Sequence, residues 1–160
     1  MLALRPFQPA DDESLISWVR SPDELLTFAG PQLSWPLDSA QLQRIRAAAD
    51  TMSWTAVRPP SVAPIGHAEL IVRRESPRRG HIARVIIDPA RRRSGLGREL
   101  ILAVLQVARA QKLEMVTLNV RKGNDGAIAL YGGLGFRETH ADHGADPAVL
   151  QMAMALGETR

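Results

Sequence analysis

A basic, glycine-containing segment in the middle of the chain has the residue types that bind phosphate groups. It runs from Asp88 to Arg98 and reads Asp-Pro-Ala-Arg-Arg-Arg-Ser-Gly-Leu-Gly-Arg. It follows a β-rich run at 81–87 and opens a helical pattern. The first turn of a helix leaves backbone N–H groups unpaired and carries partial positive charge. Because two glycines let a ligand approach that backbone and four arginines add full charges, the segment predicts a pyrophosphate-binding loop.

Three kinds of phosphate-binding loop compete for this segment. A Walker loop needs a lysine and a following hydroxyl residue, and this segment has neither. A dinucleotide-binding turn needs a third glycine, where this chain has Leu100, and it follows the first strand of a βαβ unit rather than a mid-chain hairpin. The remaining pattern is Arg/Gln-x-x-Gly-x-Gly/Ala, which Arg92 to Gly97 matches.

With this pattern the chain resembles the GCN5-related N-acetyltransferase (GNAT) superfamily. Val85-Ile86-Ile87-Asp88-Pro89 looks like the hydrophobic strand and proline upstream of the family's loop. Asn124, Ala129-Leu130-Tyr131 and Leu134-Gly135-Phe136 look like its downstream Asn…A-L-Y-x-x-x-G-F pattern. The resemblance covers residues 81–138, while the N-terminal part is similar only in its order of elements.

The resemblance implies acetyl-CoA as the cofactor and direct transfer of its acetyl group to a primary amine in a ternary complex. In this family two neighbouring parallel strands, here 81–88 and 114–121, separate to admit the pantetheine arm. The first strand would pair with that arm through its backbone, and the loop would hold the pyrophosphate. The residues implied to bind the cofactor are Val85, Ile86, Ile87, Arg92, Arg93, Ser94, Gly95, Leu96, Gly97, Arg98 and Asn124.

The resemblance also implies catalytic residues. Tyr131 would face the cofactor sulfur and protonate the departing thiolate. In the ribosomal-protein N-terminal acetyltransferases a glutamate serves as base, and the aligned residue here is Asn119, which cannot accept the proton. His81 aligns with the glutamate base of the histone acetyltransferases, and a neutral imidazole can accept a proton near pH 7. Glu69, on the same strand face as His67, is the other candidate base.

Hydrophobic periodicity predicts alternating groups of helices and strands in one domain over 1–160. Such an order indicates an α/β (α+β) sheet covered on both faces, and the resemblance implies a mixed, mostly antiparallel sheet with a splayed parallel pair. The expected strands are 2–5, 53–57, 65–73, 80–88, 115–121, 134–138 and 149–156. The expected helices are 11–19, 21–30, 38–49, 95–110 and 124–131, the last one ending at Gly132-Gly133.

Composition excludes several classes of function. The chain has no cysteine, so disulfides and thiolate sites are unavailable. No apolar run suits a signal peptide or a membrane helix, and we expect a cytoplasmic protein. Aromatic residues make up 4% and are not interleaved with basic ones, which argues against nucleic-acid binding. No metal is expected, since His140 and His143 lie in a Gly/Asp-rich loop without an accepted ligand spacing.

The sequence leaves the acceptor open. A small amine or a peptide lysine competes with a protein N-terminal amine and with an aminoglycoside, and a non-catalytic acetyl-CoA sensor is the alternative to an enzyme. Either a monomer or a homodimer is compatible with the sequence. We expect the segments at 21–37 and 139–148 to surround the acceptor, with acidic residues attracting its amine: Asp23, Glu24, Asp142 or Asp146.

Overall fold

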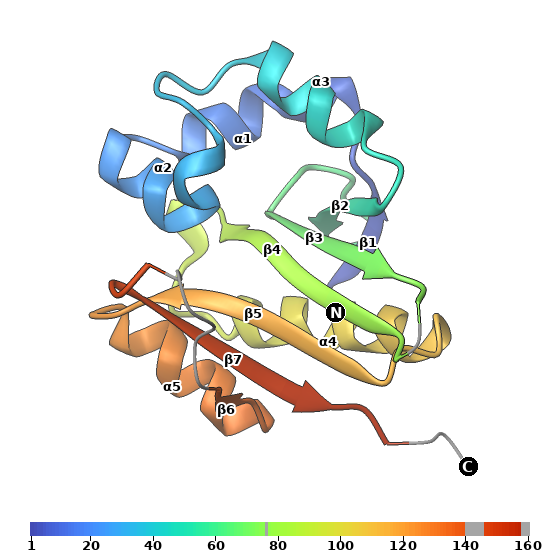
Figure 1. The fold of residues 1–160 in the computed structure, drawn as a ribbon. Helices are drawn as coiled ribbons and strands as arrows, with labels where there is room; N and C mark the ends of the chain where they lie inside the picture. Colours follow the sequence, from blue (N-terminus) through green and yellow to red (C-terminus); the bar gives the residue numbers. More distant parts are fainter. Residues whose placement is uncertain (76, 140–145, 158–160) are drawn as a thin grey trace.

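One mixed sheet organises the protein (Figure 1). The computed structural model describes residues 1–75, 77–139 and 146–157, and within these ranges seven strands pair in the order β1-β2-β3-β4-β5-β7-β6. The strands are β1 (Ala3–Pro6), β2 (Thr51–Val57), β3 (Gly66–Arg73), β4 (Arg79–Ile87), β5 (Met115–Arg121), β6 (Arg137–Glu138) and β7 (Val149–Ala155). All neighbours run antiparallel except β4 and β5, which confirms the predicted fold class.

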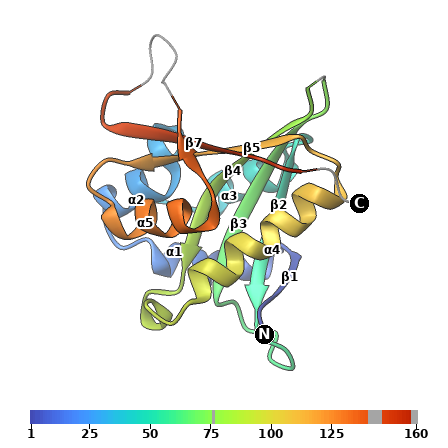
Figure 2. The same ribbon diagram turned by 90° about the horizontal axis from the view of Figure 1, so that it is seen from below.

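Helices cover both faces of the sheet. On one face lie α1 (Asp12–Trp18), α2 (Pro22–Ala29) and α3 (Ser39–Ala47); on the other lie α4 (Leu96–Ala110) and α5 (Asp125–Leu134), as Figures 1 and 2 show. Short 3-10 turns are η1 (Pro9–Asp11), η2 (Gly30–Gln32) and η3 (Pro89–Arg91). Each face has its own apolar cluster, one centred on α4 and one built by α1 to α3. The strands contribute most of their apolar side chains to the cluster around α4, among them Leu70 of β3 and Ile82 of β4.

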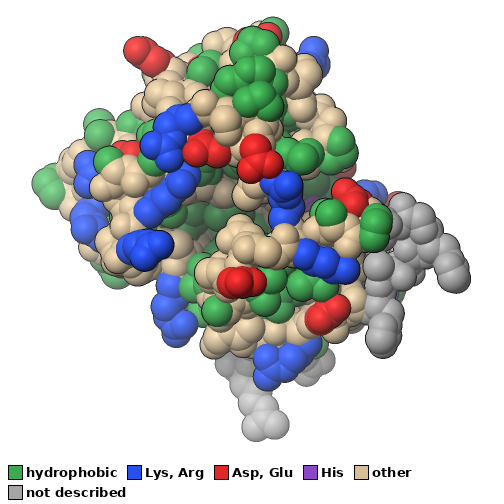
Figure 3. Space-filling view, turned by 90° about the vertical axis from the view of Figure 1, so that its left-hand side faces the viewer, with side chains coloured by type: hydrophobic (Ala, Val, Ile, Leu, Met, Phe, Trp, Pro, Cys, Tyr) green, Lys and Arg blue, Asp and Glu red, His purple; other side chains and the backbone are tan. Residues whose placement is uncertain are grey.

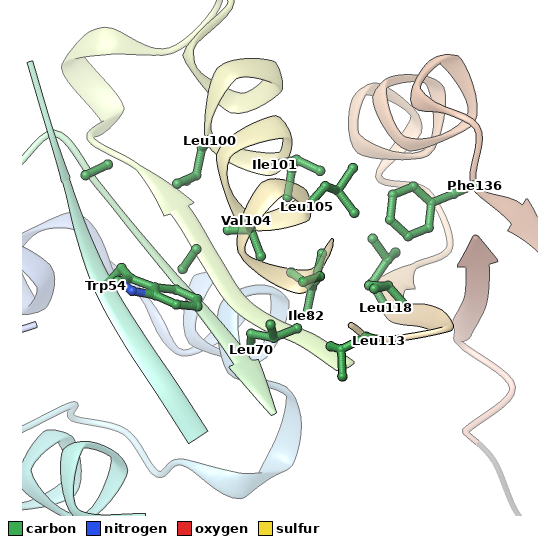
Figure 4. Close-up of a cluster of buried hydrophobic side chains, with 14 of the residues drawn as sticks. Trp54, Leu70, Ile82, Leu100, Ile101, Val104, Leu105, Leu113, Leu118 and Phe136 are labelled. Carbon is green, nitrogen blue, oxygen red and sulfur yellow. The ribbon is translucent and has the colours of Figure 1, made fainter. Parts of the chain in front are cut away.

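The helix after the basic segment anchors the larger cluster. Its apolar residues recur every three or four positions, so they share one face of a helix. The side chains of Leu100, Ile101, Val104 and Leu105 are buried and point toward the sheet (Figure 4). They pack in one cluster with Leu70 of β3. This packing fixes the start of α4 relative to the strand that precedes it.

The parallel strands β4 and β5 separate partway along their length. Their pairing extends only from Arg79 opposite Met115 to Ile82 opposite Leu118. Just beyond, two β4 residues, Arg84 and Val85, oppose the single β3 residue Ala68. This is a β-bulge, which bends the strand that carries the extra residue, and Arg84 there has a positive φ of 48°. The bend accompanies the opening between the strands, which the resemblance predicted.

The end of α5 differs from the prediction. The helix continues through Gly132-Gly133 to Leu134 and ends at Gly135, whose φ is +111°. The N–H of Gly135 donates to the Gly132 carbonyl and that of Phe136 to the Tyr131 carbonyl, the two bonds of a Schellman motif. Glycine permits this left-handed turn, and fully buried Phe136 follows it. The predicted strand at 134–138 therefore shrinks to β6.

Candidate active site

A cavity of about 640 Å³ opens where β4 and β5 separate. Figure 3 shows this face of the molecule hollowed, with Lys and Arg side chains gathered along one side of the hollow. The cavity is lined by β4, the basic segment, the first turn of α4, the end of β5 and one side of α5. Of the predicted cofactor-binding residues, Val85, Ile86, Ile87, Arg92, Arg93, Gly95, Leu96, Gly97, Arg98 and Asn124 line it. Ser94 is not among the lining residues, and its hydroxyl donates to the Arg91 carbonyl.

The start of α4 presents backbone N–H groups to this cavity. The Glu99 N–H bonds to the Gly95 carbonyl at 3.2 Å, so the N–H groups of the preceding helical residues lie ahead of the intrahelical ladder. Arg93 and Gly95 both have positive φ, 62° and 81°, which turns the loop sharply into the helix. A Cβ at Gly95 would meet no heavy atom within 4 Å. The turn is therefore open to a ligand that accepts hydrogen bonds.

The arginines of the basic segment differ in their contacts. Arg91 pairs with Asp88 at 3.5 Å, and the Nε of Arg92 donates to the Ile87 carbonyl at 3.4 Å. Arg93 and Arg98 are exposed and line the cavity. These guanidinium groups add positive charge beside the helix start, and the guanidinium fork suits phosphate oxygens.

The helix α5 supplies two polar side chains to the same cavity. The Oδ1 atom of Asn124 accepts a hydrogen bond from the Ala127 N–H at 3.4 Å and so caps the helix. The Tyr131 ring packs edge-on against Phe136, with ring centroids 5.9 Å apart. Burial raises the pKa of Tyr131 above its usual 10.0. The phenol is therefore protonated at neutral pH and can donate a proton into the cavity.

A second cavity, of about 400 Å³, adjoins the first where β4 and β5 separate. It is bordered by the end of α2, η2, and the strands β4, β5 and β7. The residues common to both cavities are Thr27, Phe28, Ile82, Ala83, Arg84, Asn119, Val120 and Arg121. The two cavities therefore meet at the point where β4 leaves β5.

His81 lines the second cavity rather than the first. Its Nδ1 atom lies 2.8 Å from the Thr117 hydroxyl, across the parallel pairing of β4 and β5. Burial lowers the pKa of His81 below its usual 6.5, and the charges of Arg84 and Arg73 lower it further. The imidazole is thus neutral at pH 7. If Nδ1 carries the proton toward Thr117, Nε2 is free to accept one.

Glu69, the other candidate base, lies outside both cavities. Its side chain is fully buried and lines neither cavity. One carboxylate oxygen accepts a hydrogen bond from the Arg84 Nε at 2.7 Å, and the other lies 2.7 Å from the Nε2 of buried His67. The alternation of β3 does turn His67 and Glu69 to the same face, as predicted. That face is covered by α1 to α3, so Glu69 contacts Arg84 instead of solvent.

Arg84 and Arg121 line both cavities, and sequence reasoning missed both. The sequence did contain an indication of Arg84, because it is a charged residue within an otherwise largely apolar expected strand, and the preceding expected strand carries Glu69. Arg121 is the last residue of β5. Its Nη1 atom donates hydrogen bonds to the Oδ1 of Asp23 at 3.1 Å and to the Thr27 hydroxyl at 2.8 Å.

The acidic residues expected around the acceptor have other contacts. Asp23 pairs with Arg121, and hydrogen bonds from Arg20, above all from its backbone N–H, lower the pKa of Glu24. Asp142, His140 and His143 lie outside the described residues. Within the described ranges no three His, Cys, Asp or Glu side chains gather as a metal site requires, and no helix there is long and apolar enough to cross a membrane.

Comparisons with known proteins agree with this geometry. The profile of the acetyltransferase (GNAT) family matches residues 14–136. A mycothiol acetyltransferase of Kineococcus radiotolerans is 31% identical over 141 residues, which are 88% of this chain and 44% of that protein. The chain thus spans less than half the length of this curated relative.

Solved structures show the same fold. A spermidine N-acetyltransferase from Vibrio cholerae, in complex with CoA and spermine, has a TM-score of 0.77 at 21% identity and covers 96% of this chain and 95% of its own. The PaiA N-acetyltransferase from Thermoplasma acidophilum, in complex with coenzyme A, has a TM-score of 0.74 at 18% identity, covering 98% and 99%. With the family profile matching more than half of its length, this chain belongs to the GNAT acetyltransferase family.

Proposed function

We propose that the chain is an acetyl-CoA-dependent N-acetyltransferase that moves an acetyl group to a primary amine, a small amine or a peptide lysine. The observation that carries this proposal is the pair of cavities meeting where β4 leaves β5. One cavity has a loop suited to a diphosphate, and the other offers a separate approach to the same point. Such a site can hold two substrates at once, as direct transfer requires.

The residues of the larger cavity fit coenzyme A. Open space at Gly95 and the unpaired N–H groups at the start of α4 suit a diphosphate, and Arg92, Arg93 and Arg98 supply charge. The edge of β4 at Val85 to Ile87 has no β5 partner, so its backbone is available to an extended arm. When bound, acetyl-CoA supplies the activated acetyl thioester.

The acceptor must lose a proton before it can attack. A lysine-type amine has a pKa near 10.4, so deprotonating it at pH 7 costs roughly 4–5 kcal/mol. His81 is the candidate base, because its imidazole is neutral and lines the acceptor-side cavity. Tyr131 is the candidate acid on the cofactor side, because it lines the larger cavity and its phenol is protonated at neutral pH. A base and an acid on opposite sides of the junction match the direction in which protons must move.

Two measurements test the proposal. Calorimetry is expected to show that acetyl-CoA binds and that an excess of CoA competes with this binding. A thiol-release assay over a panel of primary amines is expected to show turnover. Binding without turnover of any amine would support a non-catalytic acetyl-CoA sensor instead. Absence of acetyl-CoA binding would contradict both readings of the site.

The pH dependence of turnover tests His81. An imidazole accepts a proton only when neutral, so kcat/KM is expected to fall as pH drops through the lowered pKa of His81, below 6.5, and not between 7 and 6.5. His81→Gln keeps a hydrogen-bonding partner for Thr117 and is expected to lower kcat about 100-fold. The acidic limb should vanish in that variant. An unchanged limb would show that another group is the base.

A further inference from the structure

The junction of the two cavities contains a guanidinium group whose hydrogen-bonding capacity is only partly used. Arg84 lines both cavities, and its side chain is 10% exposed. We infer that the acceptor carries a carboxylate beside its amine, as an amino acid does, and that Arg84 binds this carboxylate. The inference rests on the proposed acetyl transfer and adds the class of acceptor.

Arg84 is held in place from behind. Its Nε donates to the Oε1 of Glu69 at 2.7 Å, and its Nη1 lies 3.4 Å from the Oε1 of Gln32. Glu69 is fully buried and is itself fixed by His67 at 2.7 Å. A guanidinium has five N–H donors, and among the described residues the contacts with Glu69 and Gln32 use two of them, which leaves donors on both Nη atoms for a ligand. Glu69 is thus a positioning residue for Arg84.

The backbone places Arg84 beside the edge of β4 at which the cofactor arm is proposed to bind. Arg84 is the residue of positive φ in the β4 bulge, immediately before Val85 at the edge that lacks a β5 partner. The acceptor amine must reach the acetyl group at the same junction. A carboxylate bound by Arg84 is therefore a near neighbour of the amine, which describes an α-amino acid better than a long diamine.

The acceptor-side cavity is lined by guanidinium groups more than by carboxylates, and both guanidinium groups are held by a carboxylate outside the lining, Arg84 by Glu69 and Arg121 by Asp23. Its lining includes the cations Arg84 and Arg121, and within the described part of the chain Asp146 is its one carboxylate. Asp146 is exposed, and Asp23 outside the lining is paired with Arg121. A site for a polycation would need carboxylates directed at the ligand. Forked guanidinium donors instead match a carboxylate.

Carboxylate binding also eases deprotonation of the amine. In a free amino acid the neighbouring anion stabilises the ammonium form, and pairing that anion with Arg84 removes this effect. An α-amine without a neighbouring anion has a pKa of about 8, so roughly one molecule in ten is neutral at pH 7, against about one in a few thousand for a lysine-type amine. A weak base such as His81 suits the former.

Matched acceptors test the inference. For an aromatic, an acidic and a basic side chain, kcat/KM is measured for the free amino acid, its amide and its decarboxylated amine, with the N-acetyl product identified by mass spectrometry. For at least one side chain, the amino acid is expected to exceed both relatives by about 10- to 100-fold, the range for a hydrogen-bonded charge pair. The amide separates carboxylate recognition from a low amine pKa.

Variants assign the effect to Arg84. Arg84→Gln alone would leave the buried carboxylate of Glu69 without its arginine partner, so the informative variant is Glu69→Gln with Arg84→Gln. In it the preference for the amino acid over the decarboxylated amine should fall to about 1. Arg44→Gln, at an exposed arginine on α3 outside both cavities, is the matched control and should keep the preference.

The contrary outcomes are distinct. Decarboxylated amines acetylated as well as amino acids overturn the acceptor class while acetyl transfer stands. Absence of acetylation of any amino acid also overturns the inferred acceptor class. In that case calorimetry with acetyl-CoA tests cofactor binding, and with it the proposed function, separately. A preference that survives in the double variant removes Arg84 from carboxylate binding.

Discussion

Gly95→Glu is expected to weaken acetyl-CoA binding about 1000-fold, beyond the range of routine calorimetry. Gly95 lies at the start of α4, where a side chain would project into open space on the cavity wall. A carboxylate there would repel the diphosphate and occupy the N–H groups that bind it. Losing two charge-assisted hydrogen bonds costs about 3–6 kcal/mol, which corresponds to this range of affinity.

A matched glycine separates this effect from backbone strain. Gly95 has a φ of +81°, and a glutamate there costs about 1–2 kcal/mol of folding stability by itself. Gly123 has a φ of +93°, equally open surroundings, and no place in the cavity lining. Gly123→Glu should therefore show the strain in thermal unfolding but bind acetyl-CoA normally. Unchanged affinity in Gly95→Glu would contradict the location of the diphosphate.

Tyr131→Phe is expected to lower kcat about 1000-fold while the Kd for acetyl-CoA changes little. The substitution removes only the hydroxyl, and the ring retains its packing against Phe136. If Tyr131 is the proposed acid, the departing thiolate loses its proton donor in this variant. Single-turnover kinetics at saturating acetyl-CoA measure this step directly. A wild-type rate would exclude Tyr131 as the acid.

The protonation state of Tyr131, the proposed acid, can be measured independently. Tyr131 is the single tyrosine of the chain, so the ultraviolet absorbance of tyrosinate reports on this residue alone. Burial should hold its pKa above 10.0, and the phenol should ionise only beyond that value in the folded protein. Ionisation at or below 10.0 would show that the ring is more exposed than the structure indicates.

Local patterns were sufficient for most elements. The helix expected at 95–110 matches α4, and the apolar residues that recur along it, Leu96, Leu100, Val104 and Ala108, are all buried. Asp38 and Asn124 begin the helices expected at 38–49 and 124–131, and both side chains accept hydrogen bonds from the first turns of these helices. These predictions succeed because periodicity and capping depend on residues only a few positions apart.

The end of α5 shows where local reasoning failed. Two adjacent glycines predicted a break at Gly132-Gly133, yet both lie within the helix. Glycine lowers helix stability by only about 1 kcal/mol, and burial of Phe136 beyond the helix decides where the turn falls. Gly135 ends the helix because that position directs Phe136 into the core.

The sequence by itself determined the glycine-containing loop, the helix behind it and the family, because these depend on contiguous residues whose types are restricted by backbone geometry. The tertiary structure alone decided the surroundings of the charged side chains. Glu69 is a buried partner of Arg84 because α1 to α3 cover its face of the sheet, and Arg84 reaches both cavities because a bulge in β4 turns it there. Burial and ion pairing arise between segments far apart in the chain, and no local pattern records them.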